Sequence, residues 1–168
     1  MTDRVRILGI DPGSRATGYG LIDAAGGRLA IVACGTIETS GEHSDRLRAI
    51  YRGIGDLVER WSPDEIAIER VFVHRNADSA LKLGQARAAA LCATFAIELP
   101  IYEYAARQIK KAVVGRGGAD KSQVQHMVRL LLGLAEAPQA DAADALAASI
   151  CHANSRGTQA LLLAQAAR

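Results

Sequence analysis

The 168-residue sequence predicts an α/β fold built on a five-stranded mixed sheet, and two patterns lead to this prediction. Three apolar, β-prone stretches follow one another within the first 39 residues, with only short turns between them. Beyond them, two short apolar stretches alternate with helical patterns, and such alternation is typical of parallel strands. We therefore expect the first three strands to be antiparallel and the last two to extend the sheet in parallel.

The first three strands are expected at residues 6–10, 17–22 and 29–39. Pro12-Gly13 follows the first strand and favours a turn, because proline fixes φ and glycine tolerates positive φ. The pair Gly26-Gly27 separates the second strand from the third. The two later strands are expected at 65–69 and 101–104.

Helical spacing of apolar residues begins at Ser44, a suitable N-cap, and ends at Trp61. A polar stretch at 70–78 then leads into an Ala-rich helix that ends before Pro100. Apolar residues cover much of the circumference of this helix, which indicates burial in the core or in a subunit interface. Three more helices are expected, at 106–114, 121–132 and 141–154.

The composition is that of a folded protein, with 49% hydrophobic and 23% charged residues. We expect one domain over 1–155, followed by a flexible C-terminal tail at 156–168. No apolar run approaches the roughly 20 residues of a membrane span, and the start of the chain lacks the pattern of a signal peptide. Three widely spaced cysteines fit a reducing compartment, so we expect a cytoplasmic protein.

The formal net charge of +2 is unevenly distributed along the chain. Residues 70–129 contain 10 Lys or Arg and 4 acids, a net charge of +6, whereas the remainder contains 10 basic and 14 acidic residues. A basic middle beside acidic ends suggests that one part binds a polyanion and the other supplies carboxylates. A solvated basic surface explains the charge count equally well.

Four acids lie at positions that suggest chemistry. Asp11 and Glu69 each follow a predicted buried strand, where a carboxylate is costly unless it is paired or binds a cation. Asp141 and Asp144 share one face of the last predicted helix, with no basic residue within a turn of them. A favourable interaction with the helix dipole would explain Asp141 alone, but not the set of four.

Four carboxylates without an adjacent His or Cys favour Mg²⁺ or Mn²⁺ over zinc. The chemistry typical of such a cluster is two-metal hydrolysis of a phosphodiester bond, in which one ion activates water and the other stabilises the leaving oxygen.

Five blocks of the sequence together carry a family resemblance: GIDPGSRATGYG (9–20), IERVF (68–72), NADSALKLGQAR (76–87), YAARQIKKAVVGRGGADKSQVQHMV (104–128) and QADAADALA (139–147). These blocks resemble the RuvC family of bacterial Holliday junction resolvases. The resemblance runs from about Ile7 to His152. It implies a ribonuclease H-like fold and a homodimer that nicks two opposing strands of a four-way DNA junction symmetrically. It further implies 5′-phosphate and 3′-hydroxyl products, about two Mg²⁺ or Mn²⁺ ions per subunit, and the branch-migration proteins RuvA and RuvB as partners.

The resemblance also assigns roles to individual residues. The catalytic, metal-binding acids of the family fall on Asp11, Glu69, Asp141 and Asp144. Lysines that contact DNA near the scissile phosphate fall on Lys110 and Lys121, whereas Lys82 and Lys111 are expected to be ordinary surface residues. An aromatic residue that could stack on an unpaired base falls on Phe72, although a core position is the alternative for Phe72. Arg75 and Arg116 add positive charge to loops that would face DNA.

Three other functions fit parts of this pattern. GIDPGSRATGYG is similar to the phosphate loop of ATP-binding proteins of the actin and Hsp70 type, but 168 residues cannot form their two lobes. A module that only binds branched DNA would gain nothing from four carboxylates near phosphate. Another nuclease of the same fold, such as a ribonuclease H, would be distinguished by its substrate.

Overall fold

The computed structural model describes residues 4–70 and 76–166. These residues form five strands and five α-helices in the order expected from the sequence, with a short 3₁₀ helix before the last strand. Their bounds are β1 Val5–Asp11, β2 Ala16–Ala25, β3 Arg28–Glu38, α1 His43–Trp61, β4 Glu65–Glu69, α2 Ala77–Cys92, η1 Phe95–Ile97, β5 Ile101–Tyr104, α3 Ala106–Val114, α4 Lys121–Leu131 and α5 Ala140–Ala166.

The sheet has the mixed topology that the sequence predicts. Its strand order is β3-β2-β1-β4-β5; β1, β2 and β3 pair antiparallel, whereas β4 is parallel to both β1 and β5. The prediction of an antiparallel start with a parallel extension is therefore confirmed. Strand β1 is central, so hydrogen bonds to β2 on one side and to β4 on the other fix its position.

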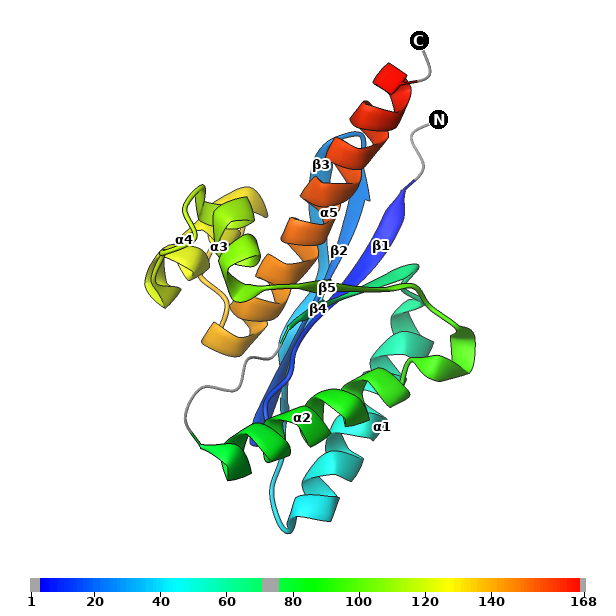
Figure 1. Cartoon of the computed structure of the whole chain (residues 1–168), viewed down its shortest axis with the longest axis vertical. Coiled ribbons are helices and arrows are strands. Elements are labelled where there is room, and N and C mark those ends of the chain that lie inside the picture. Colours follow the sequence, from blue (N-terminus) through cyan, green and yellow to red (C-terminus); the bar gives the residue numbers. More distant parts are fainter. Residues whose placement is uncertain (1–3, 71–75, 167–168) are drawn as a thin grey trace.

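Helices cover both faces of the sheet and form two separate cores (Figure 1). Helices α1 and α2 pack on one face, against alternate residues of β1 and β4 such as Leu8, Ile10 and Ile66. Helix α5 lies across the other face with α3 and α4 beside it, and Ile7 and Ala67 face it. The alternation sends successive side chains of β1 and β4 to opposite cores.

Two helices differ in length from their sequence predictions. Helix α2 ends at Cys92, and η1 with a left-handed Glu98 (φ 46°) leads the chain to Pro100. Helix α5 continues to Ala166, twelve residues beyond the predicted end at 154, through the segment expected to be a flexible tail. That segment contains no proline, and one glycine is not enough to stop a helix. Within the described part of the chain, no helix is long and apolar enough to span a membrane.

Candidate active site

Two of the predicted acids end neighbouring strands at the same edge of the sheet. Asp11 is the last residue of β1 and Glu69 is the last residue of β4. The parallel register pairs Ile10 with Ile68, one residue before each acid. Residues at the same level of a parallel pair point to the same face, so both carboxylates face α5.

Glycines bring the start of α5 close to Asp11. Gly18 pairs with Asp11 across β1 and β2, and a Cβ on Gly18 would lie 2.0 Å from the Asp141 carbonyl oxygen. A Cβ on Gly9 would lie 2.0 Å from the Ala145 carbonyl oxygen. The first turns of α5 therefore rest on bare backbone of β1 and β2, which places Asp141 and Asp144 beside the strand ends.

A pocket of about 260 Å³ lies beside the acids. Its lining residues are Asp11, Glu69, Ala106, Ile109, Lys110, Lys121, Val124 and Asp144. The structure thus brings together three of the four predicted acids and both predicted lysines. Asp141 does not line the pocket, but its charge acts on both Asp11 and Lys121.

Lys121 is positioned by the start of α4. Asp120 caps this helix: its Oδ1 accepts a hydrogen bond from the Gln123 N–H at 2.9 Å, and Gln123 Oε1 accepts from the Asp120 N–H at 3.1 Å. The ammonium of Lys121, the first residue of the helix, lies 3.3 Å from Asp144 Oδ2. Lys110 reaches the pocket from α3, which Gly115 (φ 86°) terminates.

Burial and mutual repulsion raise the pKa of two of the acids, Asp11 and Glu69. Burial raises the pKa of Asp11 to about 7, helped by the charges of Asp144, Glu69 and Asp141. Burial and the charge of Asp144 also raise the pKa of Glu69, against the opposing effect of Lys110 and Lys121. Asp144 in turn raises the pKa of Lys121. Groups whose pKa values are displaced by burial and by each other are typical of catalytic or ion-binding sites.

The donor set fits a hard divalent cation, because all the donors are carboxylate oxygens. The side chains do not form a ready-made cage: among residues 4–70 and 76–166, no three His, Cys, Asp or Glu side chains are grouped closely enough to hold an ion as they stand. Lys121 pairs with Asp144, and a bound cation would offset the repulsion among the acids.

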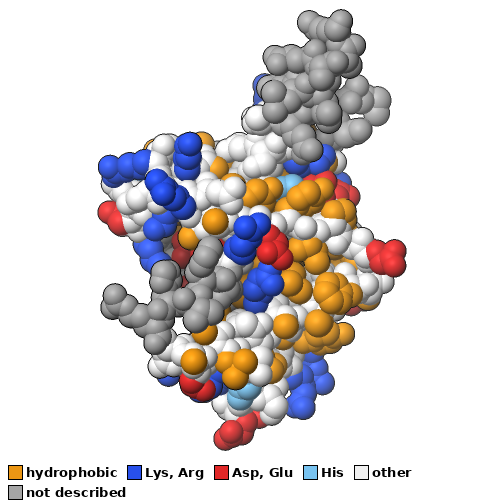
Figure 2. Space-filling view, viewed as in Figure 1, with side chains coloured by type: hydrophobic (Ala, Val, Ile, Leu, Met, Phe, Trp, Pro, Cys, Tyr) orange, Lys and Arg blue, Asp and Glu red, His pale blue; other side chains and the backbone are white. Residues whose placement is uncertain are grey.

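The remaining predicted site residues lie outside the pocket or outside the described chain. Arg116 is exposed on the loop before α4. Phe72 and Arg75 lie outside the described residues. Lys111 is exposed on α3, and Lys82 forms an ion pair with Asp78 at 2.7 Å, as expected for surface lysines. Figure 2 shows further Lys and Arg side chains gathered over α3 and α4.

Sequence reasoning missed the residues that bring these groups together. Gly9, Gly18 and Gly20 let α5 approach the sheet, and the Asp120–Gln123 capping box positions Lys121. The signal was present for both: the glycines alternate on paired strands, and an acid precedes a glutamine by three residues at a helix start.

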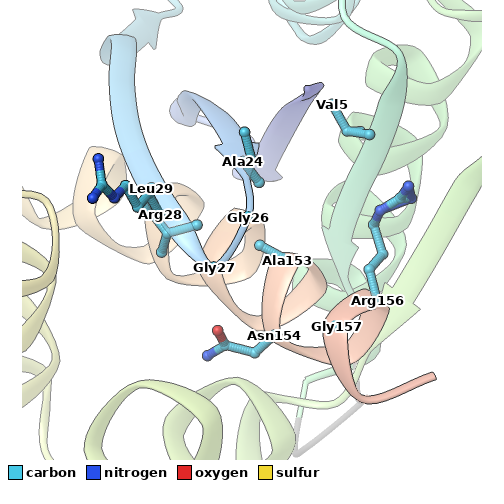
Figure 3. A pocket seen from close by; sticks show the side chains of 11 residues that line it. Val5, Ala24, Gly26, Gly27, Arg28, Leu29, Ala153, Asn154, Arg156 and Gly157 are labelled. Atoms are coloured by element: carbon cyan, nitrogen blue, oxygen red, sulfur yellow. The ribbon is translucent and has the colours of Figure 1, made fainter. Parts of the chain in front are cut away.

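A second hollow, of about 340 Å³, lies between the β2–β3 turn and the far half of α5 (Figure 3). The described residues that line it include Arg28, Asn154 and Arg156 but no acidic side chain. In Figure 3, Asn154 and Arg156 project from α5 in different directions. This hollow therefore offers no carboxylate ligands for a cation.

Comparison with known proteins yields consistent matches. The chain matches the family described as crossover junction endodeoxyribonuclease RuvC over residues 7–152. It is 58% identical to the Vibrio cholerae protein of that name over 161 residues, which cover 95% of this chain and 93% of the relative. A solved structure of Thermus thermophilus RuvC in complex with a Holliday junction substrate superposes with a TM-score of 0.83 at 35% identity, covering 89% and 93% of the two chains. The structure of T. thermophilus RuvC gives a TM-score of 0.82 at 33% identity, covering 91% of this chain and 96% of that one.

Proposed function

Because the chain belongs to the RuvC family of crossover junction endodeoxyribonucleases, we propose that it resolves four-way DNA junctions by nicking two opposing strands. It is an endonuclease, a hydrolase of phosphodiester bonds, with a ribonuclease H-like fold. The observation that carries the proposal is the pocket itself: three carboxylates and two lysines line one cavity of about 260 Å³.

Asp11, Glu69, Asp141 and Asp144 are the proposed metal ligands and catalytic acids. The raised pKa of Asp11 supports this assignment: burial and the neighbouring acids both disfavour its charged form, and a divalent cation would stabilise that form. Two Mg²⁺ or Mn²⁺ ions would supply an activated water and stabilise the leaving 3′ oxygen, which gives 5′-phosphate and 3′-hydroxyl ends. The acids would hold these ions in the pocket beside Lys110 and Lys121.

Lys110 and Lys121 are the proposed phosphate-binding residues. Both line the pocket together with the strand-end acids, Lys110 from α3 and Lys121 from α4. An ammonium there would hold the scissile phosphate and offset the charge that develops in the transition state. By resemblance to the family, Phe72, Arg75 and Arg116 complete the proposed DNA-contacting set, with Phe72 stacking on an unpaired base.

A homodimer would place two such pockets on one junction. Helix α2 has an exposed apolar side that includes Ala77, Leu81, Ala88 and Cys92. Leu81 is 62% exposed, and Phe95 on the adjoining η1 is 57% exposed. Figure 2 shows hydrophobic side chains gathered over α2, η1 and β5. An apolar surface of this kind on a helix favours a subunit interface. RuvA and RuvB, the family's branch-migration proteins, are the further proposed partners, in the cytoplasm.

The test is cleavage of a synthetic mobile junction with Mg²⁺, with the nick positions mapped on all four strands. Paired nicks at the same position in two opposing strands are expected, with religatable ends. An RNA–DNA hybrid of the same length serves as the second substrate. Cleavage of the hybrid in preference to the junction, or nicks confined to one strand, would contradict the proposed function.

A further inference from the structure

A buried polar cluster around His152 joins α5 to β4 and β5. Its Glu65 is the first residue of β4, at the end remote from Glu69, and its Tyr104 is the last residue of β5, paired with Glu69. His152 is 1% exposed, and both its ring nitrogens have partners. Its Nε2 lies 2.5 Å from Glu65 Oε2, and its Nδ1 lies 2.7 Å from the Tyr104 hydroxyl oxygen. The ring also stacks on Tyr102, with 4.2 Å between centroids. Arg156 Nη1 lies 2.8 Å from the second Glu65 oxygen. None of these residues lines the acidic pocket.

The hydrogen bonds of this cluster have one consistent direction. Burial lowers the pKa of His152, which favours the neutral ring. An ionised carboxylate only accepts hydrogen bonds, so Nε2–H donates to Glu65 and the Tyr104 hydroxyl donates to Nδ1. Arg156 donates to Glu65 from the next turn of α5. A chain of bonds with every ring nitrogen used fixes both the ring and the helix that carries it.

The sheet beneath α5 offers few side chains that could fix the position of this helix, so hydrogen bonds contribute to fixing it. Helices usually interlock with a neighbouring surface through side chains on both sides. Under α5, β1 and β2 present backbone at Gly9, Gly18 and Gly20, where the helix comes too close for a Cβ. Hydrogen bonds from α5 to the sheet are directional contacts of the required kind. The Ser149 hydroxyl donates to the Gly20 carbonyl oxygen at 2.8 Å, and His152 contacts Glu65 one turn further along the helix.

The spacing of the cluster matches the spacing of the site. Glu65 and Glu69 lie on one face of β4, four residues or about 13 Å apart. Asp144 and His152 lie eight residues apart on α5, or about 12 Å. His152 contacts Glu65 at one end, and the charge of Asp144 acts on Glu69 at the other. Helix and strand therefore run antiparallel with matched intervals.

We propose that His152 and Glu65 are positioning residues: their contact sets where α5 lies along β4, and thereby how close Asp141 and Asp144 lie to Asp11 and Glu69. A shift of α5 by one residue would move these acids by about 1.5 Å and rotate them by about 100°. This inference rests on the proposed function, because it takes the four acids as the metal ligands.

The experiment measures Mn²⁺ binding to the DNA-free protein by the electron paramagnetic resonance signal of free Mn²⁺, well below the unfolding temperature. His152→Leu removes both hydrogen bonds of the ring. Ile54→Ala is the matched control, because Ile54 is fully buried in the other core, on α1. We expect His152→Leu to bind Mn²⁺ about tenfold more weakly. Ile54→Ala should bind as the wild type does, although it also lowers Tm.

Two further variants make the result specific. His152→Gln keeps an N–H donor for Glu65 and should recover most of the lost affinity. Glu65→Gln, which keeps the shape of the side chain but loses its charge, should weaken binding about threefold and gives the same test if His152→Leu does not fold.

Asp144→Asn separates failure of this inference from failure of the proposed site. If Asp144→Asn binds Mn²⁺ as tightly as the wild type, the proposed metal site is wrong. If Asp144→Asn loses affinity but the His152 and Glu65 variants do not, the positioning role is overturned. An equal loss of affinity in His152→Leu and Ile54→Ala would also overturn it, since general destabilisation would then be the cause.

Discussion

Lys121 Nζ lies 3.3 Å from Asp144 Oδ2, so the first residue of α4 meets the start of α5 across the acidic pocket. The lysine side chain is 73% exposed, whereas that of Asp144 is 22% exposed. An ion pair with one partner in solvent contributes at most about 1 kcal/mol. Lys121 can therefore exchange Asp144 for a DNA phosphate at little cost, while Asp144 keeps its place among the other acids.

Asp144→Asn should reduce nicking below about 1% of the wild-type rate without weakening junction binding. The substitution removes a proposed metal ligand but leaves Lys110, Lys121 and the basic surface unchanged. Nicking would be measured in Mg²⁺ and binding in EDTA, by gel shift. Asp45→Asn, which changes an exposed acid paired with Arg48 on α1, is the control and should cleave normally. Near-normal nicking by Asp144→Asn would refute the four-carboxylate mechanism.

Lys121→Ala should weaken junction binding and reduce its dependence on salt. A lysine that neutralises one phosphate releases about one counterion, so the slope of log affinity against log salt should fall by about 1. Lys111→Ala is the matched control, because Lys111 is exposed on α3 and does not line the pocket. The measurement is a binding titration at four or more salt concentrations. An unchanged slope for Lys121→Ala would argue against a phosphate contact.

Asp11→Asn should stabilise the protein in EDTA, and more so at high pH. The folded state raises the pKa of Asp11 from 3.8 to about 7, so between these values it binds the proton more tightly than the unfolded state does. The free energy of unfolding therefore falls as pH rises through this window, and the loss is complete above about pH 7. Asparagine removes the loss, so Tm should rise by about 5 °C at pH 8 and little at pH 4. A gain independent of pH would contradict this account.

The elements that the sequence predicted best are those bounded by strong local signals. Strand β4 is predicted with its observed bounds, because Pro63 precedes it and one acid stands at each end of its apolar run 66–68. Strand β5, which follows Pro100, was equally well predicted. Helix α2 was predicted too long, because its alanine-rich sequence contains no stop signal before Pro100, and the turn through Ala93 and η1 depends on tertiary packing.

The site shows the same division between local and tertiary information. Asp11 and Glu69 could be predicted as site residues, because a carboxylate at the end of a buried strand is costly unless a cation or a basic partner neutralises it. The closeness of Asp141 to Asp11 could not, because it depends on the packing of α5 against Gly18. Close approach of backbones is a property of two elements together. Neither pattern alone predicts it.

Leu81→Glu should convert the proposed homodimer to a monomer. Leu81 lies on the exposed apolar side of α2, and a buried, unpaired carboxylate in an interface would cost more than the leucine contributes. Sedimentation velocity at about 10 μM would report the change; at this concentration the wild type should sediment as a dimer and the variant as a monomer. Leu130→Glu is the matched control, because Leu130 is 52% exposed on α4, away from α2, and should leave the dimer intact.

Since one subunit holds one pocket, the Leu81→Glu monomer should still nick a junction in Mg²⁺, but its two nicks should no longer be coordinated. A wild type that sediments as a monomer, or paired nicks from a monomeric variant, would exclude the α2 interface as the basis of symmetric cleavage.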